Sequence, residues 1–139
     1  MSEYKRFFRE EGISWGIYIR IECNALPLSE HGENAVQVND VLYFSRKPYP
    51  REDPSYVAKR NASFYEGLKL IANEFSMVVK KPTVIKVLNM DWTPTDFQIE
   101  AYGYGIAGWV IQEFKLDTKL PDLRYDSKVG YIFPYSIDE

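Results

Sequence analysis

The chain has 139 residues, of which 45% are hydrophobic and 27% charged, and its formal net charge is −3. This composition is typical of a folded protein, and one domain is the usual organisation at this length, so we predict a single α+β domain over residues 1–139. The negative charge argues against a general nucleic-acid or acidic-membrane binder, because both classes need a basic surface. Cys23 is the one cysteine, which excludes an intramolecular disulfide and a zinc site built from several cysteines.

The N-terminal segment, residues 1–11, carries several charges and lacks the apolar stretch of a signal peptide. No window of the sequence approaches the roughly 18 consecutive apolar residues of a membrane helix. We therefore expect a cytoplasmic protein that does not bind a membrane.

The first predicted element is a strand over residues 14–23. Apolar residues alternate there with more polar ones, which predicts one buried face. The buried set is Trp15, Ile17, Ile19, Ile21 and Cys23. A polar loop follows, and a second β-rich run over residues 35–44 is predicted to pair with the first strand.

The next predicted element is a long helix over residues 54–75. Asp53 is a good N-terminal cap and Pro54 suits the first helical position. Apolar residues then recur at helical spacing. A third strand is predicted over residues 83–90, where β-branched residues are dense.

A second helix is predicted over residues 95–114, with Thr93 or Thr95 as its cap. The tail is predicted to form a small hairpin that pairs residues 123–125 with 131–133. The order is therefore β-β-α-β-α plus a C-terminal hairpin or loop. It predicts a small, mainly antiparallel sheet with two helices on one face.

Residues 103–108 have the letters of the dinucleotide-binding fingerprint, G-x-G-x-x-G. The fingerprint works at a turn from a strand into a helix, whereas these residues fall inside a predicted helix. A phosphate-binding turn would require residues 97–102 to form a strand. We favour a packing role for Gly105 and Gly108, because each glycine costs a helix about 1 kcal/mol relative to alanine.

His31 and Glu33 have the H-x-E spacing of zinc deaminases. That site needs two more sulfur ligands, which one cysteine does not supply. Cys23 lies on the apolar side of a predicted strand, so we expect a buried structural thiol. The sequence predicts no metal, no cofactor and no catalytic residue.

The turn after the third predicted strand holds Asp91, Trp92 and Asp96. A tryptophan between carboxylates is a candidate surface for a basic protein partner. The same two aspartates also fit an enzyme with an acidic pocket. A purely structural turn, with the tryptophan folded onto the core, is the third interpretation.

The segment from Tyr43 to Arg60 has five basic and two acidic residues interleaved with tyrosines. Arginine beside aromatic rings is one way to bind single-stranded RNA. The candidate RNA-binding residues are Arg46, Lys47, Tyr49 and Arg51. The alternative is a solvated loop and helix face.

Four runs of sequence resemble domain IV of elongation factor G. They are Ile17-Tyr18-Ile19-Arg20-Ile21-Glu22, Val38-Asn39-Asp40-Val41, Pro54 to Leu68 with its Tyr65-Glu66-Gly67-Leu68 end, and Pro82-Thr83-Val84-Ile85-Lys86-Val87. The resemblance covers about residues 14–115 and implies the ribosomal protein S5 domain 2-like fold, with two helices over one face of a small sheet. The glycine-rich approach to the first strand is absent, so no functional residue is carried over.

These observations lead to one principal hypothesis and two alternatives. The principal hypothesis is a non-enzymatic protein-binding domain, such as an inhibitor or immunity protein. The alternatives are an RNA- or ribosome-associated domain and an enzyme with a pocket near Asp91 and Asp96. A protein partner is therefore expected, and nucleic acid is the less favoured one.

Overall fold

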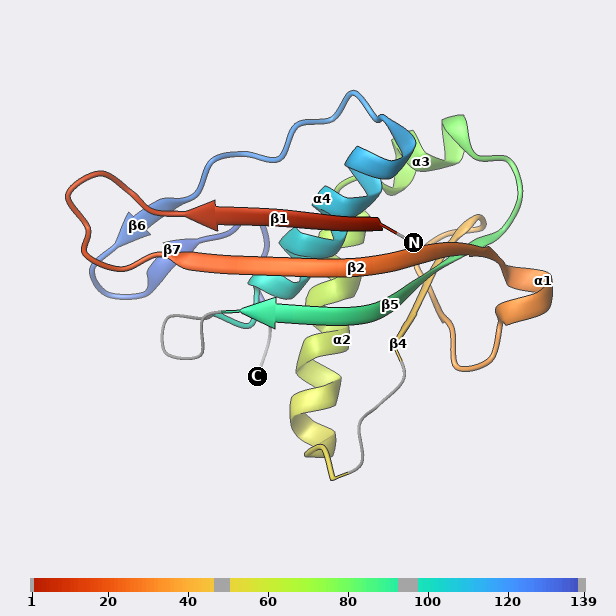
Figure 1. Ribbon diagram of the computed structural model, residues 1–139, viewed down its shortest axis with the longest axis horizontal. Coiled ribbons are helices and arrows are strands. Elements are labelled where there is room, and N and C mark those ends of the chain that lie inside the picture. The colour runs from red at the N-terminus through yellow and green to blue at the C-terminus, as the bar shows by residue number, and fades with distance from the viewer. Residues whose placement is uncertain (1, 47–50, 93–97, 138–139) are drawn as a thin grey trace.

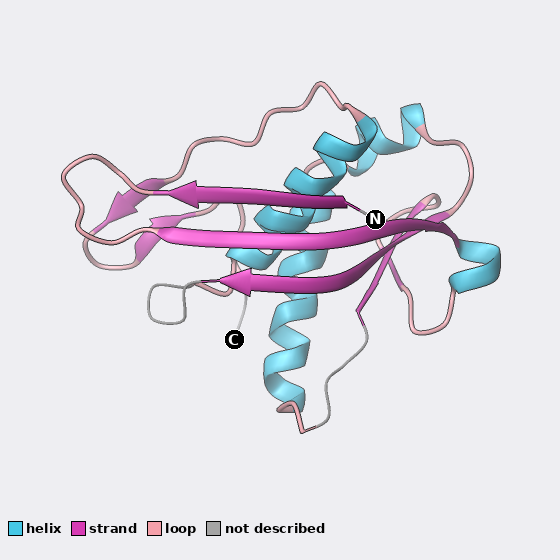
Figure 2. Cartoon of the chain, viewed as in Figure 1, coloured by secondary structure: helices cyan, strands magenta, loops and turns pink. Residues whose placement is uncertain are grey.

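The computed structural model describes residues 2–46, 51–92 and 98–137, apart from the side chain of Trp92. It has the predicted α+β class, with a mixed five-stranded sheet, helices packed on one of its faces and a small two-stranded hairpin (Figures 1 and 2). The large sheet contains β1 (Ser2–Phe8), β2 (Ile17–Pro27), β3 (Val36–Gln37), β4 (Leu42–Arg46) and β5 (Thr83–Trp92). The helices are α1 (Leu28–His31), α2 (Pro54–Lys69), α3 (Ala72–Val78) and α4 (Ala101–Phe114), and the hairpin joins β6 (Arg124–Asp126) to β7 (Gly130–Ile132).

The strand order is β1-β2-β5-β4-β3, and β4 and β5 run parallel while the other neighbours run antiparallel. The predicted pairing of residues 35–44 with the first strand is wrong, because β4 pairs with β5 and β3. A helix lies between β4 and β5 in the chain, and this connection allows them to lie parallel. Strand β1 has no counterpart in the predicted elements.

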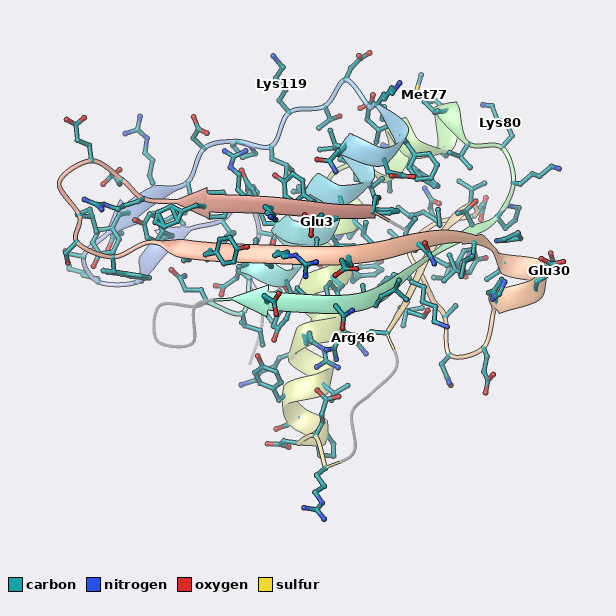
Figure 3. The ribbon with its side chains drawn as sticks, viewed as in Figure 1. Glu3, Glu30, Arg46, Met77, Lys80 and Lys119 are labelled. Atoms are coloured by element: carbon teal, nitrogen blue, oxygen red, sulfur yellow. The ribbon has the colours of Figure 1, made fainter. Side chains whose placement is uncertain are left out.

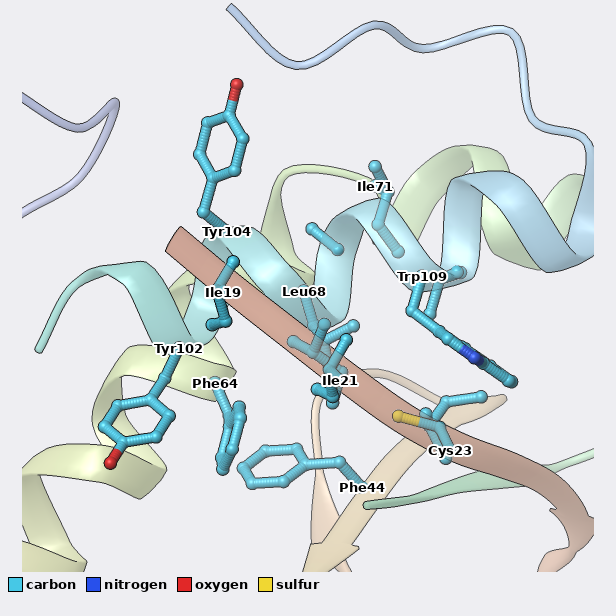
Figure 4. Close-up of a cluster of buried hydrophobic side chains, with 14 of the residues drawn as sticks. Ile19, Ile21, Cys23, Phe44, Phe64, Leu68, Ile71, Tyr102, Tyr104 and Trp109 are labelled. Carbon is cyan, nitrogen blue, oxygen red and sulfur yellow. The ribbon is translucent and has the colours of Figure 1, made fainter. Parts of the chain in front are cut away.

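The core lies between the sheet and the helices (Figure 4). Ile17, Ile19, Ile21 and Cys23 are all 0% exposed, which confirms the predicted buried face of the first strand. Trp15 precedes β2 and is half-buried. Its ring meets those of Tyr125 and Tyr131 edge-on, at centroid distances of 5.6 and 5.1 Å.

The first predicted long helix is divided into α2 and α3. Asp53 caps α2 as expected, since its carboxylate accepts a hydrogen bond of 3.0 Å from the amide of Ser55. The helix ends at Lys69, where the amides of Leu70 and Ile71 turn back to the carbonyls of Gly67 and Leu68 at 3.1 Å. The periodic apolar pattern continues through this break because Phe75 of α3 is buried in the same core as Phe64 and Leu68 of α2.

The glycines of α4 lie at close contacts, which confirms their predicted packing role. A β-carbon on Gly105 would lie 2.8 Å from Cδ1 of Ile19, and one on Gly108 would lie 2.3 Å from the ring of Tyr4. The crossing of α4 with α2 is tighter still, because a β-carbon on Gly103 would lie 2.0 Å from the carbonyl oxygen of Ser63. These glycines sit within a helix and not at a strand-to-helix turn, so the phosphate-binding interpretation is wrong.

The predicted start of the second helix, at Thr93 or Thr95, lies outside the described residues, and α4 begins at Ala101. The C-terminal hairpin forms as predicted, in the register that pairs Tyr125 with Tyr131. Among the described helices, none has the length and apolar character needed to cross a membrane.

Candidate functional site

Two groups of polar side chains stand out, one on each side of the sheet. The first lies on the face that points away from α2 and α4, which we call the outer face. It is built by alternate residues of three neighbouring strands. These residues are Glu3, Lys5, Phe7, Tyr18, Arg20, Glu22, Asn89 and Asp91.

Arg20 is the centre of the outer face. Its Nε donates to Oε2 of Glu3 at 2.6 Å, its Nη1 donates to Oδ2 of Asp91 at 3.1 Å, and its Nη2 donates to Glu22. The hydrogen bond from Arg20 holds the pKa of Glu3 below its usual range. Three carboxylates thus share one guanidinium.

This face is open to solvent over β1, β2 and β5. Figure 3 shows Glu3 projecting from the front of the sheet, with α2 and α4 behind it. The side chain of Asp91 is 66% exposed, and Phe7 is 56% exposed opposite Tyr18. Charged groups and one exposed ring are therefore presented on a rigid strand scaffold.

The structure bears on part of the predicted site at Asp91, Trp92 and Asp96. Asp91 lies on the outer face, and the backbone of Trp92 pairs with Ile19. The Trp92 side chain and Asp96 lie outside the described residues, so the predicted grouping of Asp91, Trp92 and Asp96 on one surface stays a prediction. The partner of Asp91, Arg20, was missed because only the strand register brings the two residues together.

The second group lies inside, between the end of β4 and α2, and we call it the arginine cluster. It consists of Arg46, Glu52, Arg60 and Tyr102. The side chains of Arg46, Glu52 and Arg60 are 5, 17 and 3% exposed. Nη1 of Arg60 donates to Oε2 of Glu52 and its Nη2 lies 3.4 Å from Oε1, while Nη1 of Arg46 lies 3.8 Å from Oε2.

Tyr56 adjoins the arginine cluster through Tyr102, which belongs to it. The hydroxyls of Tyr56 and Tyr102 are 2.7 Å apart, and burial is the main cause that raises the pKa of Tyr102. Arg46 and Arg60 oppose that shift, which places their charges near the ring. Among the described residues the cluster brings together two guanidiniums and one carboxylate, and Nε of Arg60 is buried there without a hydrogen-bond partner.

The cluster changes the interpretation of the predicted RNA-binding segment. Arg46 was expected on a surface, yet its side chain is buried on the helix side of the sheet. Arg51 is exposed and has a φ of 70°. Lys47 and Tyr49 lie outside the described residues, so an RNA-binding role for the segment stays a prediction.

A hollow of about 310 Å³ lies where α1 and the turn after it fold beside β4 and β5. Its polar lining includes Glu30, His31, Glu33 and Lys86. The described residues contain no group of three side chains suited to hold a metal ion. Cys23 points into the core, and burial raises the pKa of its thiol, so it is poorly suited to act as a ligand or nucleophile.

Comparison of the chain with protein-family models, with characterised proteins and with solved structures finds no match. The resemblance to domain IV of elongation factor G therefore stays a prediction.

Proposed function

We propose that the chain is a non-enzymatic protein-binding domain that binds a basic partner through its outer face. The observation that carries the proposal is the open sheet face on which Arg20 orders three carboxylates beside an exposed phenylalanine. More specifically, we propose an inhibitor or immunity-type protein that blocks a cytosolic enzyme.

Both the net charge of the outer face and the fixed positions of its carboxylates favour this role. Glu3, Glu22 and Asp91 against Lys5 and Arg20 give the face three acids and two bases, a net charge of −1, in a chain of −3. The carboxylates are already fixed by Arg20, so less side-chain freedom is lost when a partner binds. An arginine or lysine of the partner can bind the oxygens that Arg20 leaves free, and opposite charge speeds association.

The test compares two charge reversals. Asp91→Lys changes the outer face, whereas Asp40→Lys changes an exposed residue in the turn between β3 and β4 and serves as the matched control. Each protein is immobilised and exposed to a lysate of the native host, and captured proteins are identified by mass spectrometry. We expect a partner that wild type and Asp40→Lys retain and that Asp91→Lys loses without a change in melting temperature.

The purified partner then distinguishes the alternatives. Its affinity should fall as salt rises, and cross-links should involve Lys5 or residues near it. Equal retention by both variants would contradict binding through the outer face. Capture that disappears after nuclease treatment would favour the RNA-associated function instead.

A further inference from the structure

Strand β2 runs through the middle of the outer face with a hydrogen-bonded strand on each side. It pairs with β1 from Ile17 to Cys23 and with β5 from Ile19 to Pro27. A partner that lies over β2 therefore makes its contacts through side chains. An extended segment laid there would find no partner for its own backbone groups, whereas a helix bonds these groups internally. The element that best suits this face is a helix.

The width of the face also suits a helix. Neighbouring strands lie about 4.8 Å apart, so β1 and β5 are separated by about 9.6 Å across β2. A helix with its side chains is about 10 to 12 Å wide. The side chains of Arg20 and Glu22 on β2 are 22 and 17% exposed, whereas Lys5 and Asp91 on the flanking strands are 57 and 66% exposed. A helix that lies along β2 can therefore contact exposed side chains of both neighbours.

The strand register divides the outer face into rows of different chemistry. The opposite pairs of β1 and β2 are Phe7 with Tyr18, Lys5 with Arg20, and Glu3 with Glu22. Asp91 continues the middle row on the other side of Arg20. Successive rows are about 6.6 Å apart, because a strand rises about 3.3 Å per residue. An aromatic row, a row that ends at Asp91 and an acidic row thus follow one another along β2.

The spacing of these rows matches one side of a helix. Residues four positions apart lie on the same side and about 6.0 Å apart along the axis. The aromatic row favours an apolar side chain. Glu3 and Asp91 favour bases, because a carboxylate can accept from a second donor while it keeps its bond to Arg20. The middle base approaches from the β5 side, since Lys5 lies at the other end of that row.

We infer that the outer face binds a helix of the basic partner, and that this helix lies along β2 and presents one apolar and two basic residues at intervals of four. The apolar residue lies against Phe7 and Tyr18, the middle base against Asp91, and the last base against Glu3 and Glu22. The inference rests on the proposed function and names the element of the partner that binds. Anchors at regular intervals on one side are how a helix is commonly recognised.

The test uses a display library built on a stable helical scaffold, with one side of the helix randomised and selection against the wild-type protein. We expect the selected sequences to share an apolar residue and two bases at successive four-residue intervals. Synthetic peptides of the selected sequence are then compared by calorimetry with peptides in which the middle base is glutamine. This replacement should weaken binding about fivefold, the upper end of what an exposed ion pair contributes.

An exchange of charges identifies the residue that the middle base meets. Asp91→Lys should weaken the selected peptide, and a peptide with glutamate at the middle position should bind Asp91→Lys more tightly than it binds the wild-type protein. Asp40→Lys, the matched control, should bind both peptides as the wild-type protein does. The glutamine peptide on the wild-type protein decides the matter independently if Asp91→Lys fails to fold.

Three results overturn the inference: no helix is selected, the selected helices lack this spacing, or the exchange of charges leaves binding by the glutamate peptide unchanged. The proposed function is judged separately, by capture of a host partner that Asp91→Lys loses. If the segment of such a partner that cross-links to the outer face is not helical, this inference is overturned and the proposed function stands.

Discussion

The crossing of α2 and α4 predicts a large effect for the smallest possible substitution, Gly103→Ala. The added β-carbon would lie 2.0 Å from the carbonyl oxygen of Ser63, whereas ordinary contact begins at 3.4 Å. The difference, 3.4 − 2.0, is 1.4 Å, and the helices must separate by about that distance because the obstacle is backbone. The amide of Gly103 also donates to Oγ of Ser63 at 2.9 Å inside the core, and separation would break this bond.

The expected cost follows from these contacts. Overpacking of a core costs about 1 to 3 kcal/mol, and a buried donor without its partner costs about 1 to 3 kcal/mol more. Alanine returns about 1 kcal/mol of helix propensity. The net loss in the free energy of unfolding is therefore about 1 to 5 kcal/mol, which lowers the melting temperature of a domain of this size by roughly 3 to 17 °C.

Urea unfolding followed by circular dichroism measures the effect, with Gly105→Ala as the matched control on the same helix. The β-carbon at position 105 would meet Cδ1 of Ile19 at 2.8 Å, the free end of a side chain that can rotate. Gly105→Ala should therefore be within about 1 kcal/mol of wild type. Equal stabilities of the two variants would refute the argument that backbone contact sets the cost at Gly103.

Three further predictions concern single side chains. Glu52→Gln should lower the free energy of unfolding by about 3 kcal/mol, because it leaves two buried guanidiniums without their shared carboxylate. Arg60→Met should lower the free energy of unfolding by less in the same denaturation experiment. The reverse order of the two variants would contradict this account of the arginine cluster. Thiol reagents should modify Cys23 only as fast as the protein unfolds, since the side chain is 0% exposed and burial raises the pKa of its thiol; rapid labelling of the native protein would refute this. Hydrogen bonds from the Thr118 hydroxyl and from two backbone amides hold the pKa of Glu74 below its usual range. Because the unfolded chain binds the proton first, the stabilisation by these bonds is lost as pH falls below about 4.3. The difference in melting temperature between wild type and Glu74→Gln should therefore vanish at low pH, and a difference that persists would contradict this prediction.

Local patterns were sufficient for the elements whose buried face is apolar. The alternation through Ile17, Ile19 and Ile21 predicted β2, and the cap at Asp53 predicted the start of α2. Strand β1 was missed because its inward row includes a charge. Arg6 lies on that row, where its guanidinium stacks 5.1 Å from the ring centre of Phe8, so the alternation is not apolar.

Strand pairing was harder to predict than strand position. Nothing in residues 42–46 distinguishes a strand that pairs with β2 from one that pairs with β5. The choice is made by α2, which covers the helix side of the sheet and returns the chain parallel to β4. The same geometry turns the Arg46 side chain inward, so a segment that looks like a basic surface in the sequence contributes a buried ion pair.

The close crossing of α2 and α4 at Gly103 also determines where Arg60 lies relative to Glu52 and Arg46. Contacts of Gly105 with Ile19 and of Gly108 with Tyr4 hold α4 beneath β2 and β1. The close approach at Gly103 then fixes α2 at the opposite side of α4, where Phe64 packs against Phe44 of β4 at a ring-centroid distance of 5.7 Å. Arg46 is the last described residue of β4, and Arg60 on the first half of α2 shares the carboxylate of Glu52 with it. A helix pair that crossed less closely would shift Arg60 relative to Glu52, and we therefore expect Glu52→Gln to cost less stability in a Gly103→Ala background than in a Gly105→Ala background.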